Sequence, residues 1–232
     1  MGGFKNQSLN LNFRDGLFSI IVVALKKSCN LMVNDHIDNG TTIENHEEKI
    51  RTHLLENYLD KDEMRSAIGL STCPLRFLVE SPENYDPSTN SYVGRTDIKV
   101  ASKNWFNNRN DYFIIECKRI DGTATLNNKY VTEGVSRFIG SPPKYSSYHN
   151  KNFMLGFIVK NIDVNKNLSD ISEIHAKELS SSIRNNMLLK ESSSLFYYCE
   201  SEYINGLLLA HIFYDVSSVI AWNIVELIRF II

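Results

Sequence analysis

The sequence predicts an α/β fold with a mixed central sheet, and three observations lead to this prediction. Hydrophobic residues make up 43% of the 232 residues and charged residues 22%, which is the composition of a globular chain. The predicted elements follow the order helix, three-stranded meander, helix and strand, which is an α/β arrangement. One extended segment, 153–159, is apolar throughout, as expected for a strand that is buried on both faces.

The N-terminal part of the chain is predicted to be helical. Segment 15–36 contains an apolar run, 17–25, that is nine residues long and ends at Lys26 and Lys27. A run of this length is too short to span a bilayer, and no small-residue cleavage site follows it, so we expect a buried helix and no membrane anchor. A second helix is expected over 43–59, where apolar residues recur with helical spacing.

The middle of the chain carries the elements that define the fold class. Short apolar or alternating segments are separated by polar loops around residues 81–91 and 107–110. A helical pattern and the apolar segment follow them. In chain order, we expect strands at 75–80, 92–100 and 112–120, a helix at 130–139 and a strand at 153–159.

The C-terminal third is predicted to extend this core with a polar helix, two strands and an amphipathic terminal helix. These elements are expected at 169–190, near 195–199, at 207–214 and at 219–232. The terminal segment is interrupted by Asn223, Glu226 and Arg229, so we do not expect it to cross a membrane. We therefore expect one domain over residues 1–232, with an N-terminal helical extension (1–42), a core (43–159) that carries the candidate site residues, and a C-terminal extension (160–232).

Charge is distributed unevenly along the chain. Residues 95–166 carry 12 Lys and Arg against 6 Asp and Glu, a net charge of +6, whereas the segments on either side each have a net charge of −4. A polyanionic partner such as nucleic acid would explain this basic segment. Chance clustering of charges on a solvated face explains it equally well.

The positions of the cysteines and histidines argue against a secreted disulfide-bonded protein and against a zinc site. Cys29, Cys73, Cys117 and Cys199 lie far apart and form no CxxC pair, which favours a reducing cytoplasm over secretion. The six histidines have no zinc-binding spacing, and the sequence contains no GxSxG, P-loop or dinucleotide-binding motif. We therefore expect a cytoplasmic protein.

Two neighbouring predicted strands carry the residues that point to chemistry. Because side chains alternate between the faces of a strand, Asp97 shares a face with Lys99, and Glu116 shares a face with Lys118. If the strands pair, two carboxylates and an ammonium group meet on one face of an otherwise apolar sheet, where they are costly to bury without a partner. A divalent cation held by Asp97 and Glu116 would be such a partner, and Mg²⁺ needs only one or two protein carboxylates.

The lysine two residues after the glutamate also has a chemical use. Lys118 can orient or help to deprotonate a metal-bound water, and it can offset charge that develops on a phosphate. Hydrolysis of a phosphodiester needs such a nucleophile and such a cation. The alternative interpretation is an exposed, salt-bridged hairpin without a catalytic role.

This pattern resembles the PD-(D/E)XK nuclease superfamily, which has the restriction-endonuclease-like fold. Asp97 lies in Gly-Arg-Thr-Asp-Ile, and Glu116 follows 19 residues later in Glu-Cys-Lys, after a hydrophobic run. The family's core order matches that of residues 43–159, and Thr96 stands where the family name has Pro. The resemblance implies metal-dependent phosphodiester cleavage, with Asp97 and Glu116 as ligands of Mg²⁺, for which Mn²⁺ would substitute, and with Lys118 as the catalytic lysine.

The resemblance also implies an acidic residue from the first core helix, and Glu44, Glu47 and Glu48 compete for this role. Glu47 falls on the apolar stripe of segment 43–59 and should face inward, whereas Glu48 lies on a more polar face. Glu44 fits better as a helix-terminal charge. We therefore expect Glu47 at the catalytic site. Glu80, at the end of the first strand, could also reach the site or could simply cap a sheet edge.

The helix expected at 130–139 and the loop after it carry candidate contacts to nucleic acid. Arg137 could clamp a phosphate, or it could pair with Glu133 on the helix surface. Gly134 in the middle of this helix suggests a close approach by another backbone or by nucleic acid. The loop interleaves cations and aromatics, which suits phosphate contacts and base stacking, although its aromatics could instead pack on the sheet. The candidates are Arg95, Tyr130, Arg137, Lys144 and Tyr148.

The sequence therefore predicts a Mg²⁺-dependent nuclease, with DNA favoured over RNA, and the resemblance makes bacterial restriction or antiviral defence the expected setting. The pattern contains no separate DNA-reading module, so specificity would come from loops, from a homodimer or from a partner protein such as an ATPase. The terminal helix 219–232 is a candidate docking surface for that partner, or it packs on its own core. Two alternatives stay open: a nuclease-fold subunit that binds without cleaving, and a nuclease that cleaves RNA.

Overall fold

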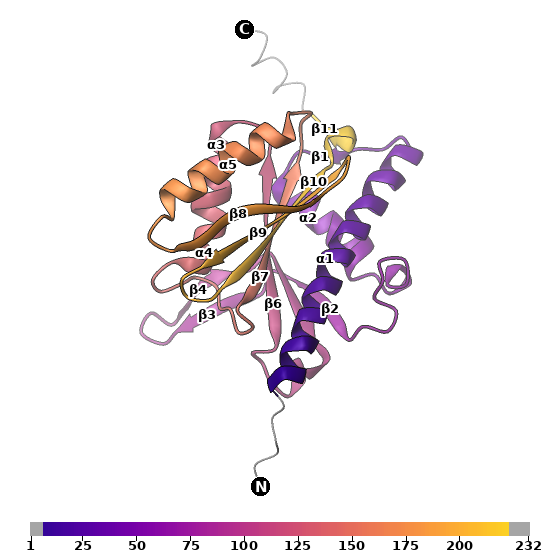
Figure 1. Cartoon of the computed structure of the whole chain (residues 1–232). Helices are drawn as coiled ribbons and strands as arrows, with labels where there is room; N and C mark the ends of the chain where they lie inside the picture. The colour runs from indigo at the N-terminus through magenta and orange to yellow at the C-terminus, as the bar shows by residue number, and fades with distance from the viewer. Residues whose placement is uncertain (1–6, 223–232) are drawn as a thin grey trace.

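The computed structural model describes residues 7–222 and has an α/β architecture built on a mixed seven-stranded sheet (Figure 1). The strand order is β2-β5-β6-β7-β10-β9-β8. Strand β7 runs parallel to both of its neighbours, β6 and β10, and the other pairs are antiparallel. The strands are β2 (Leu75–Val79), β5 (Ile98–Ser102), β6 (Tyr112–Ile120), β7 (Lys151–Ile158), β8 (Ile183–Ser192), β9 (Phe196–Tyr203) and β10 (Leu208–Asp215). The predicted α/β class with a mixed sheet is confirmed.

Helices cover both faces of this sheet (Figure 1). Helix α1 (Gln7–Asp38) packs on one face, where Phe18 stacks on Phe153 of β7 with ring centroids 4.7 Å apart. Helices α3 (Ala124–Lys129) and α5 (Val164–Glu178) cover the other face. Because both faces are covered, β6 and β7 are buried along nearly their whole length.

Helix α1 is longer than the apolar run that predicted it. Its part from Arg14 to Asp38 is long and apolar enough to cross a membrane by length and composition, and half of its most apolar stretch is buried inside the protein. A buried core helix and a membrane-spanning helix both meet this criterion. The absence of a membrane anchor therefore stays a prediction.

The meander contains a hairpin that the sequence pattern did not indicate. The predicted loop 81–91 and the predicted strand 92–100 are both wrong in their bounds, because the chain forms β3 (Pro82–Asp86) and β4 (Ser91–Arg95), which pair with each other. Thr96 and Asp97 then separate β4 from β5. Asn84 and Asn90 adopt positive φ angles of 53° and 51°, which asparagine tolerates better than most residues, and so allow the hairpin to form.

The two helices nearest the predicted site also have shifted bounds. Residues Ile43–Glu44 form a short strand, β1, that pairs in parallel with β11 (Ile220–Ala221), and helix α2 runs only over Glu47–Leu54 before a π-helical turn. Glu44 is therefore not a helix-terminal charge. The helix expected at 130–139 begins earlier, at Ala124, because the Thr123 side chain caps it. It continues through a π-helical turn into α4 (Ser136–Ile139).

The predicted polar helix at 169–190 is wrong in its second half. Helix α5 begins after Asp163, whose side chain accepts a hydrogen bond from the Lys166 backbone N–H at 3.0 Å, and it ends at Glu178. The residues after 182 form the edge strand β8, which is mostly exposed and so lacks the apolar alternation that predicts a strand. Of the predicted terminal helix 219–232, Val219 ends a 3-10 turn, residues 220–221 form β11, and residues 223–232 lie outside the described residues.

A buried polar network joins β9 and β10 to the helices on their face. His211 contacts the hydroxyls of Tyr130 at 3.0 Å and Ser201 at 2.7 Å, and His175 contacts the Tyr203 hydroxyl at 2.7 Å. All five side chains are almost completely buried. Burial, and then the proximity of His175, hold the pKa of His211 well below its usual range, and burial also lowers the pKa of His175.

This network predicts a loss of stability in mild acid. The unfolded chain takes up protons on these histidines near pH 6.5 while the folded chain keeps them neutral, so the free energy of unfolding falls as the pH drops below that value. Between pH 7.5 and pH 5.5, His211→Gln should lose about 1 kcal/mol less than the wild type in urea titrations. His46→Gln, at an exposed position, should lose as much as the wild type. Equal losses in all three proteins would contradict the assignment.

Candidate active site

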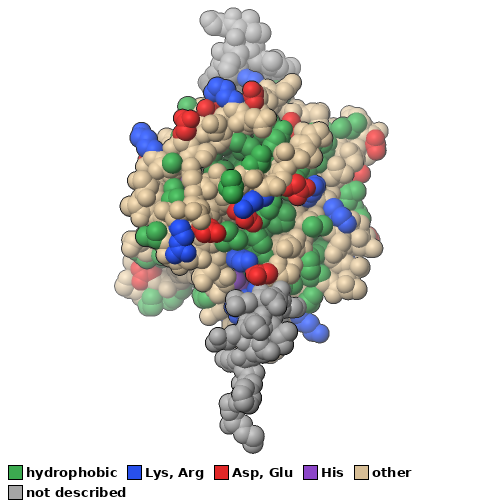
Figure 2. All heavy atoms as spheres, in the orientation of Figure 1, with side chains coloured by type: hydrophobic (Ala, Val, Ile, Leu, Met, Phe, Trp, Pro, Cys, Tyr) green, Lys and Arg blue, Asp and Glu red, His purple; other side chains and the backbone are tan. Residues whose placement is uncertain are grey.

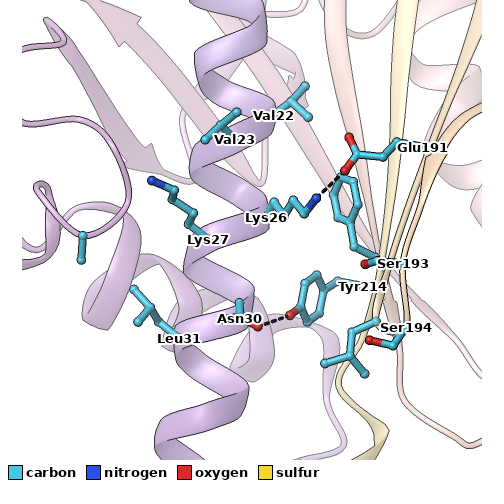
Figure 3. Close-up of a pocket in the computed structure, with 13 residues that line it drawn as sticks. Val22, Val23, Lys26, Lys27, Asn30, Leu31, Glu191, Ser193, Ser194 and Tyr214 are labelled. Atoms are coloured by element: carbon cyan, nitrogen blue, oxygen red, sulfur yellow. Dashed lines mark hydrogen bonds and ion pairs between the residues drawn. The ribbon is translucent and has the colours of Figure 1, made fainter.

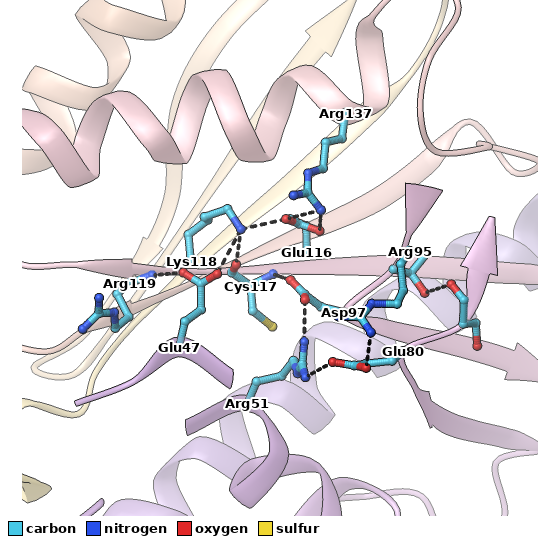
Figure 4. A network of polar contacts seen from close by, with 12 residues as sticks. Glu47, Arg51, Glu80, Arg95, Asp97, Glu116, Cys117, Lys118, Arg119 and Arg137 are labelled. Atoms are coloured by element: carbon cyan, nitrogen blue, oxygen red, sulfur yellow. Dashed lines mark hydrogen bonds and ion pairs between the residues drawn. The ribbon is translucent and has the colours of Figure 1, made fainter. Parts of the chain in front are cut away.

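Lys118, near the C-terminal end of strand β6, lies at the centre of a cluster of polar side chains (Figure 4). Its ammonium Nζ donates to Glu116 Oε1 at 2.7 Å, to the Cys117 carbonyl at 2.9 Å and to Glu47 Oε1 at 3.1 Å. Glu116 is completely buried. The expected sharing of one sheet face by Glu116 and Lys118 is confirmed by this contact.

Asp97 joins the cluster from the bend that precedes β5. Its Oδ2 accepts a hydrogen bond from the Cys117 backbone N–H at 2.7 Å, and its Oδ1 accepts one from Arg51 Nη1 at 2.6 Å. Lys99, which was expected on the same face as Asp97, lies two residues further along, in β5. Its Nζ pairs with Glu83 Oε2 at 3.2 Å and takes no part in the cluster. The structure thus brings Asp97 close to the Glu116–Lys118 pair, although Asp97 lies in the bend before β5 and not in the strand whose alternation predicted its place.

Glu47 is the acidic residue that helix α2 supplies. It is the first residue of the helix, and its Oε2 accepts a hydrogen bond from the Arg119 backbone N–H at 3.0 Å, so the side chain is fixed between Lys118 and the end of β6. Glu48 is exposed at the rim of the same cleft, and Glu44 pairs with Lys49 instead. Of the three candidates, Glu47 is the one that contacts Lys118.

Arginines neutralise the carboxylates of the cluster. Arg51 bridges two of them, with Nη1 on Asp97 Oδ1 and Nη2 on Glu80 Oε1, both at 2.6 Å. Arg95 pairs with the other oxygen of Glu80 at 2.9 Å, and Arg137 lies 3.1 Å from Glu116 Oε1. The sequence analysis missed Arg51, although it lies one helical turn after Glu47 and therefore on the same face of α2.

Tyr145 holds Glu116 from the side opposite Lys118. Its hydroxyl lies 2.7 Å from Glu116 Oε2, 2.7 Å from the Arg95 carbonyl and 2.5 Å from Arg137 Nη1. The ring is fully buried, so the loop after α4 anchors in the cluster rather than lying on the surface. Nothing in the sequence pattern distinguishes Tyr145 from the other aromatics of that loop.

Burial sets the electrostatics of the two central groups. Burial, and then the charge of Asp97, raise the pKa of Glu116 to about 7, although Lys118 and Arg137 oppose this shift. Burial alone would lower the pKa of Lys118, but Glu116 and Glu47 outweigh it and raise that pKa to about 12. Lys118 is therefore an ammonium ion at neutral pH, suited to stabilising negative charge and not to accepting a proton.

The cluster opens into a cleft of about 350 Å³ between α2 and the helical segment formed by α3 and the π-helical turn after it. Arg95 lies at this cleft and is 68% exposed, and Arg137 is partly exposed behind it. Lys144 and Tyr148 are exposed on the neighbouring loop. Tyr130 is buried under His211 and is not accessible to nucleic acid, so its proposed contact does not fit the structure. The lining residues are His46, Glu47, Glu48, Arg51, Glu80, Arg95, Lys118, Arg119, Leu126, Lys129 and Glu133.

The packing of the helix against the sheet explains why a glycine occupies position 134. A Cβ atom at this position would lie 2.6 Å from Cε of Met154 and 3.4 Å from Cγ of Lys118. The close neighbours are therefore side chains of the sheet, and neither another backbone nor nucleic acid is needed to explain the glycine. The absence of a side chain lets the helix approach the stem of Lys118.

The donor types of the cluster fit a hydrated divalent cation in part. Asp97 and Glu116 supply carboxylate oxygens, the ligands that Mg²⁺ prefers, and Mg²⁺ keeps several waters of its own. Within residues 7–222, no three His, Cys, Asp or Glu side chains lie close enough together to hold a metal ion. Both carboxylates instead contact cationic side chains, so a cation would have to share or replace those contacts.

A larger groove lies away from this cluster. It measures about 700 Å³ and separates α1 from the turn between β8 and β9 (Figure 3). Hydrophobic side chains gather along this face of the molecule (Figure 2). Lys26 and Glu191 form an ion pair across the groove, and Asn30 contacts the Tyr214 hydroxyl at 3.2 Å. These groups hold α1 against the sheet.

Comparison with known proteins finds no relative of this chain. No protein-family model, curated protein or solved structure matches it significantly. What the chain does must therefore be argued from its own geometry.

Proposed function

We propose that this chain is a Mg²⁺-dependent nuclease that hydrolyses phosphodiester bonds, with DNA as the favoured substrate. One observation carries the proposal. Lys118 contacts Glu116 and Glu47 beside one cleft, Asp97 accepts a hydrogen bond from the backbone N–H of Cys117, between Glu116 and Lys118 in the chain, and arginines pair with the carboxylates. Buried carboxylates beside a lysine are costly to maintain in an otherwise apolar sheet, which favours a functional origin for the cluster.

Each residue of the cluster would have a separate role in this reaction. Asp97 and Glu116 would hold Mg²⁺, which supplies a water nucleophile and neutralises phosphate charge when it is bound. The Lys118 ammonium, held by Glu47, would stabilise charge that develops on the scissile phosphate. Arg95 at the cleft is placed to bind the phosphate backbone of the substrate. Tyr145 and Lys118 fix the Glu116 carboxylate from two sides.

The order and pairing of elements support the resemblance to PD-(D/E)XK nucleases. Helix α2 precedes the antiparallel strands β2, β5 and β6, and a helical segment then leads to β7, which is parallel to β6. This is the order expected for a restriction-endonuclease-like core, here with the β3–β4 hairpin inserted between β2 and β5. The resemblance favours restriction or antiviral defence in the cytoplasm as the setting, with a homodimer or a partner protein such as an ATPase supplying specificity.

A second candidate is a nuclease-fold subunit that binds its partner without cleaving it. The observation in its favour is charge balance, since the four carboxylates of the cluster are matched by four cations without a metal ion. The two sets are Glu47, Glu80, Asp97 and Glu116, and Arg51, Arg95, Lys118 and Arg137. Cleavage of RNA is a third outcome, because the cluster itself does not distinguish the two nucleic acids.

An assay of nucleic-acid cleavage by the wild type and by the Asp97→Asn variant separates these candidates. The substrates are supercoiled plasmid, single-stranded DNA and RNA, each with Mg²⁺ or Mn²⁺. We expect the wild type to cleave DNA and Asp97→Asn to be slower by about 100-fold or more, because a metal ligand and its charge are lost. Asp111→Asn is the matched control, since the Asp97 and Asp111 side chains are both 16% exposed but Asp111 pairs with His149 outside the cleft.

Each result of that assay has a definite meaning. Cleavage of RNA alone would replace the favoured substrate. Binding without cleavage, equal in all three proteins, would favour the non-catalytic subunit. Cleavage that survives in Asp97→Asn would remove this cluster from the reaction.

A further inference from the structure

We propose that Arg51 occupies the position at Asp97 that a divalent cation would take, and that cation binding transfers its guanidinium to Glu80 alone. This inference rests on the proposed function, because it concerns how the same cluster admits its metal ion. It assigns Arg51 as a positioning residue that sets the cation concentration at which the site fills.

The two oxygens of Asp97 have different freedom. Oδ2 accepts the Cys117 backbone N–H at 2.7 Å, which fixes the carboxylate on strand β6. Oδ1 is the remaining oxygen, and it is the atom that Arg51 Nη1 contacts at 2.6 Å. A cation that binds Asp97 without disturbing the strand contact must therefore compete with Arg51 for Oδ1.

Arg51 is held in this position by burial and by a second carboxylate. Its side chain is only 6% exposed, and Nη2 donates to Glu80 Oε1 at 2.6 Å. Its Nε is buried with no hydrogen-bond partner among the described residues. A buried donor without an acceptor costs free energy, so the two carboxylate contacts hold Arg51 in place at the cost of an unsatisfied Nε.

Glu80 is placed to keep the guanidinium once it leaves Asp97. It adopts a positive φ angle of 39°, which is unfavourable for a residue with a side chain, and its backbone N–H donates to the Asp97 carbonyl at 3.1 Å. Arg95 pairs with the other oxygen of Glu80, so Oε1 is the oxygen that faces Arg51. The charge of Arg51 thus stays compensated when a cation takes Oδ1.

Competition of this kind lowers the apparent affinity for the cation. The apparent affinity is the intrinsic one multiplied by the fraction of molecules in which Oδ1 is free. Removing the bridging guanidinium should therefore tighten binding. Arg51→Lys is the sharpest variant because it keeps the positive charge but lacks the planar fork that bridges two carboxylates. Arg51→Met removes the charge as well, while its apolar side chain suits the buried position.

The test measures Mn²⁺ binding to metal-free protein by calorimetry, with electron paramagnetic resonance of free Mn²⁺ as a second readout. We expect Arg51→Lys to tighten binding by about threefold or more and Arg51→Met by about tenfold or more. Arg95→Lys and Arg95→Met are the matched controls, because Arg95 contacts Glu80 but not Asp97. The Arg95 variants should change the affinity by less than about twofold. Thermal melts verify that each variant is folded, and Arg51→Lys decides the matter if Arg51→Met unfolds.

Three results would overturn the inference. Arg51→Lys could bind Mn²⁺ as the wild type does, or Arg95→Met could match Arg51→Met, which would show a general effect of charge. Absence of Mn²⁺ binding in every protein, the Arg51 variants included, would contradict both this inference and the metal site of the proposed function. Tighter binding in the Arg51 variants without any cleavage of nucleic acid would sustain the inference and reject the nuclease.

Discussion

Replacing Lys118 with methionine is expected to reduce Mg²⁺-dependent DNA cleavage by about 100-fold or more, the loss that follows removal of one group stabilising transition-state charge. The Lys118 ammonium lies among Glu116, Glu47 and the Cys117 carbonyl, and its pKa of about 12 keeps it charged at neutral pH. Methionine preserves the stem of the side chain and removes the charge. Rates of plasmid cleavage at saturating Mg²⁺ measure the effect.

Lys99→Met is the matched control for this substitution. Lys99 is also a buried lysine on a central strand, and it also pairs with a buried glutamate, Glu83, at 3.2 Å. Both variants leave a buried carboxylate without its lysine, so both should lose stability. Only Lys118→Met should lose cleavage beyond what its melting temperature explains. Equal losses in the two variants would mean that Lys118 acts through stability alone.

Replacing Phe18 with alanine is expected to lower the free energy of unfolding by about 3–5 kcal/mol, the range for a large aromatic side chain lost from a core. Phe18 is 5% exposed and stacks on Phe153, which in turn packs against the Phe113 ring with centroids 6.0 Å apart. These contacts fasten α1 to the face of the sheet opposite Glu116 and Lys118. Urea unfolding of the purified proteins measures the difference.

Val23→Ala is the comparison within the same helix. Val23 is 45% exposed, so its truncation should change the free energy of unfolding by about 0.5 kcal/mol or less. A Phe18→Ala variant as stable as Val23→Ala would show that α1 does not pack on the sheet in solution. The apolar side chains of α1 would then have to be buried elsewhere, and a membrane is the environment that the length and composition of this helix would suit.

The part of the site that sequence reasoning could predict depends on local periodicity. The two-residue repeat of a strand placed Glu116 and Lys118 on one face, and the helical stripe singled out Glu47 from Glu44 and Glu48. Both inferences need only the geometry of one element. The pairing of β5 with β6, which brings Asp97 to Cys117, followed from their order along the chain.

The part that sequence reasoning missed depends on contacts between distant segments. Tyr145 reaches Glu116 only because the loop after α4 folds back beneath β4, where a Cβ on Gly94 would lie 3.0 Å from the Lys144 carbonyl. Arg51 is recognisable only once Glu80 and Asp97 are seen to converge on it. The β3–β4 hairpin was hidden because its residues are polar and largely exposed, so they lack the apolar alternation of a buried strand.

Anomalous diffraction from crystals grown with Mn²⁺ tests whether Asp97 and Glu116 hold a metal ion, because it locates the ion without reference to activity. We predict one ion in the cleft, coordinated by Asp97 Oδ1 and by the Glu116 carboxylate, with waters completing its shell and Arg51 paired to Glu80 only. An empty cleft at saturating Mn²⁺, or an ion held there without Asp97 and Glu116, would contradict this prediction.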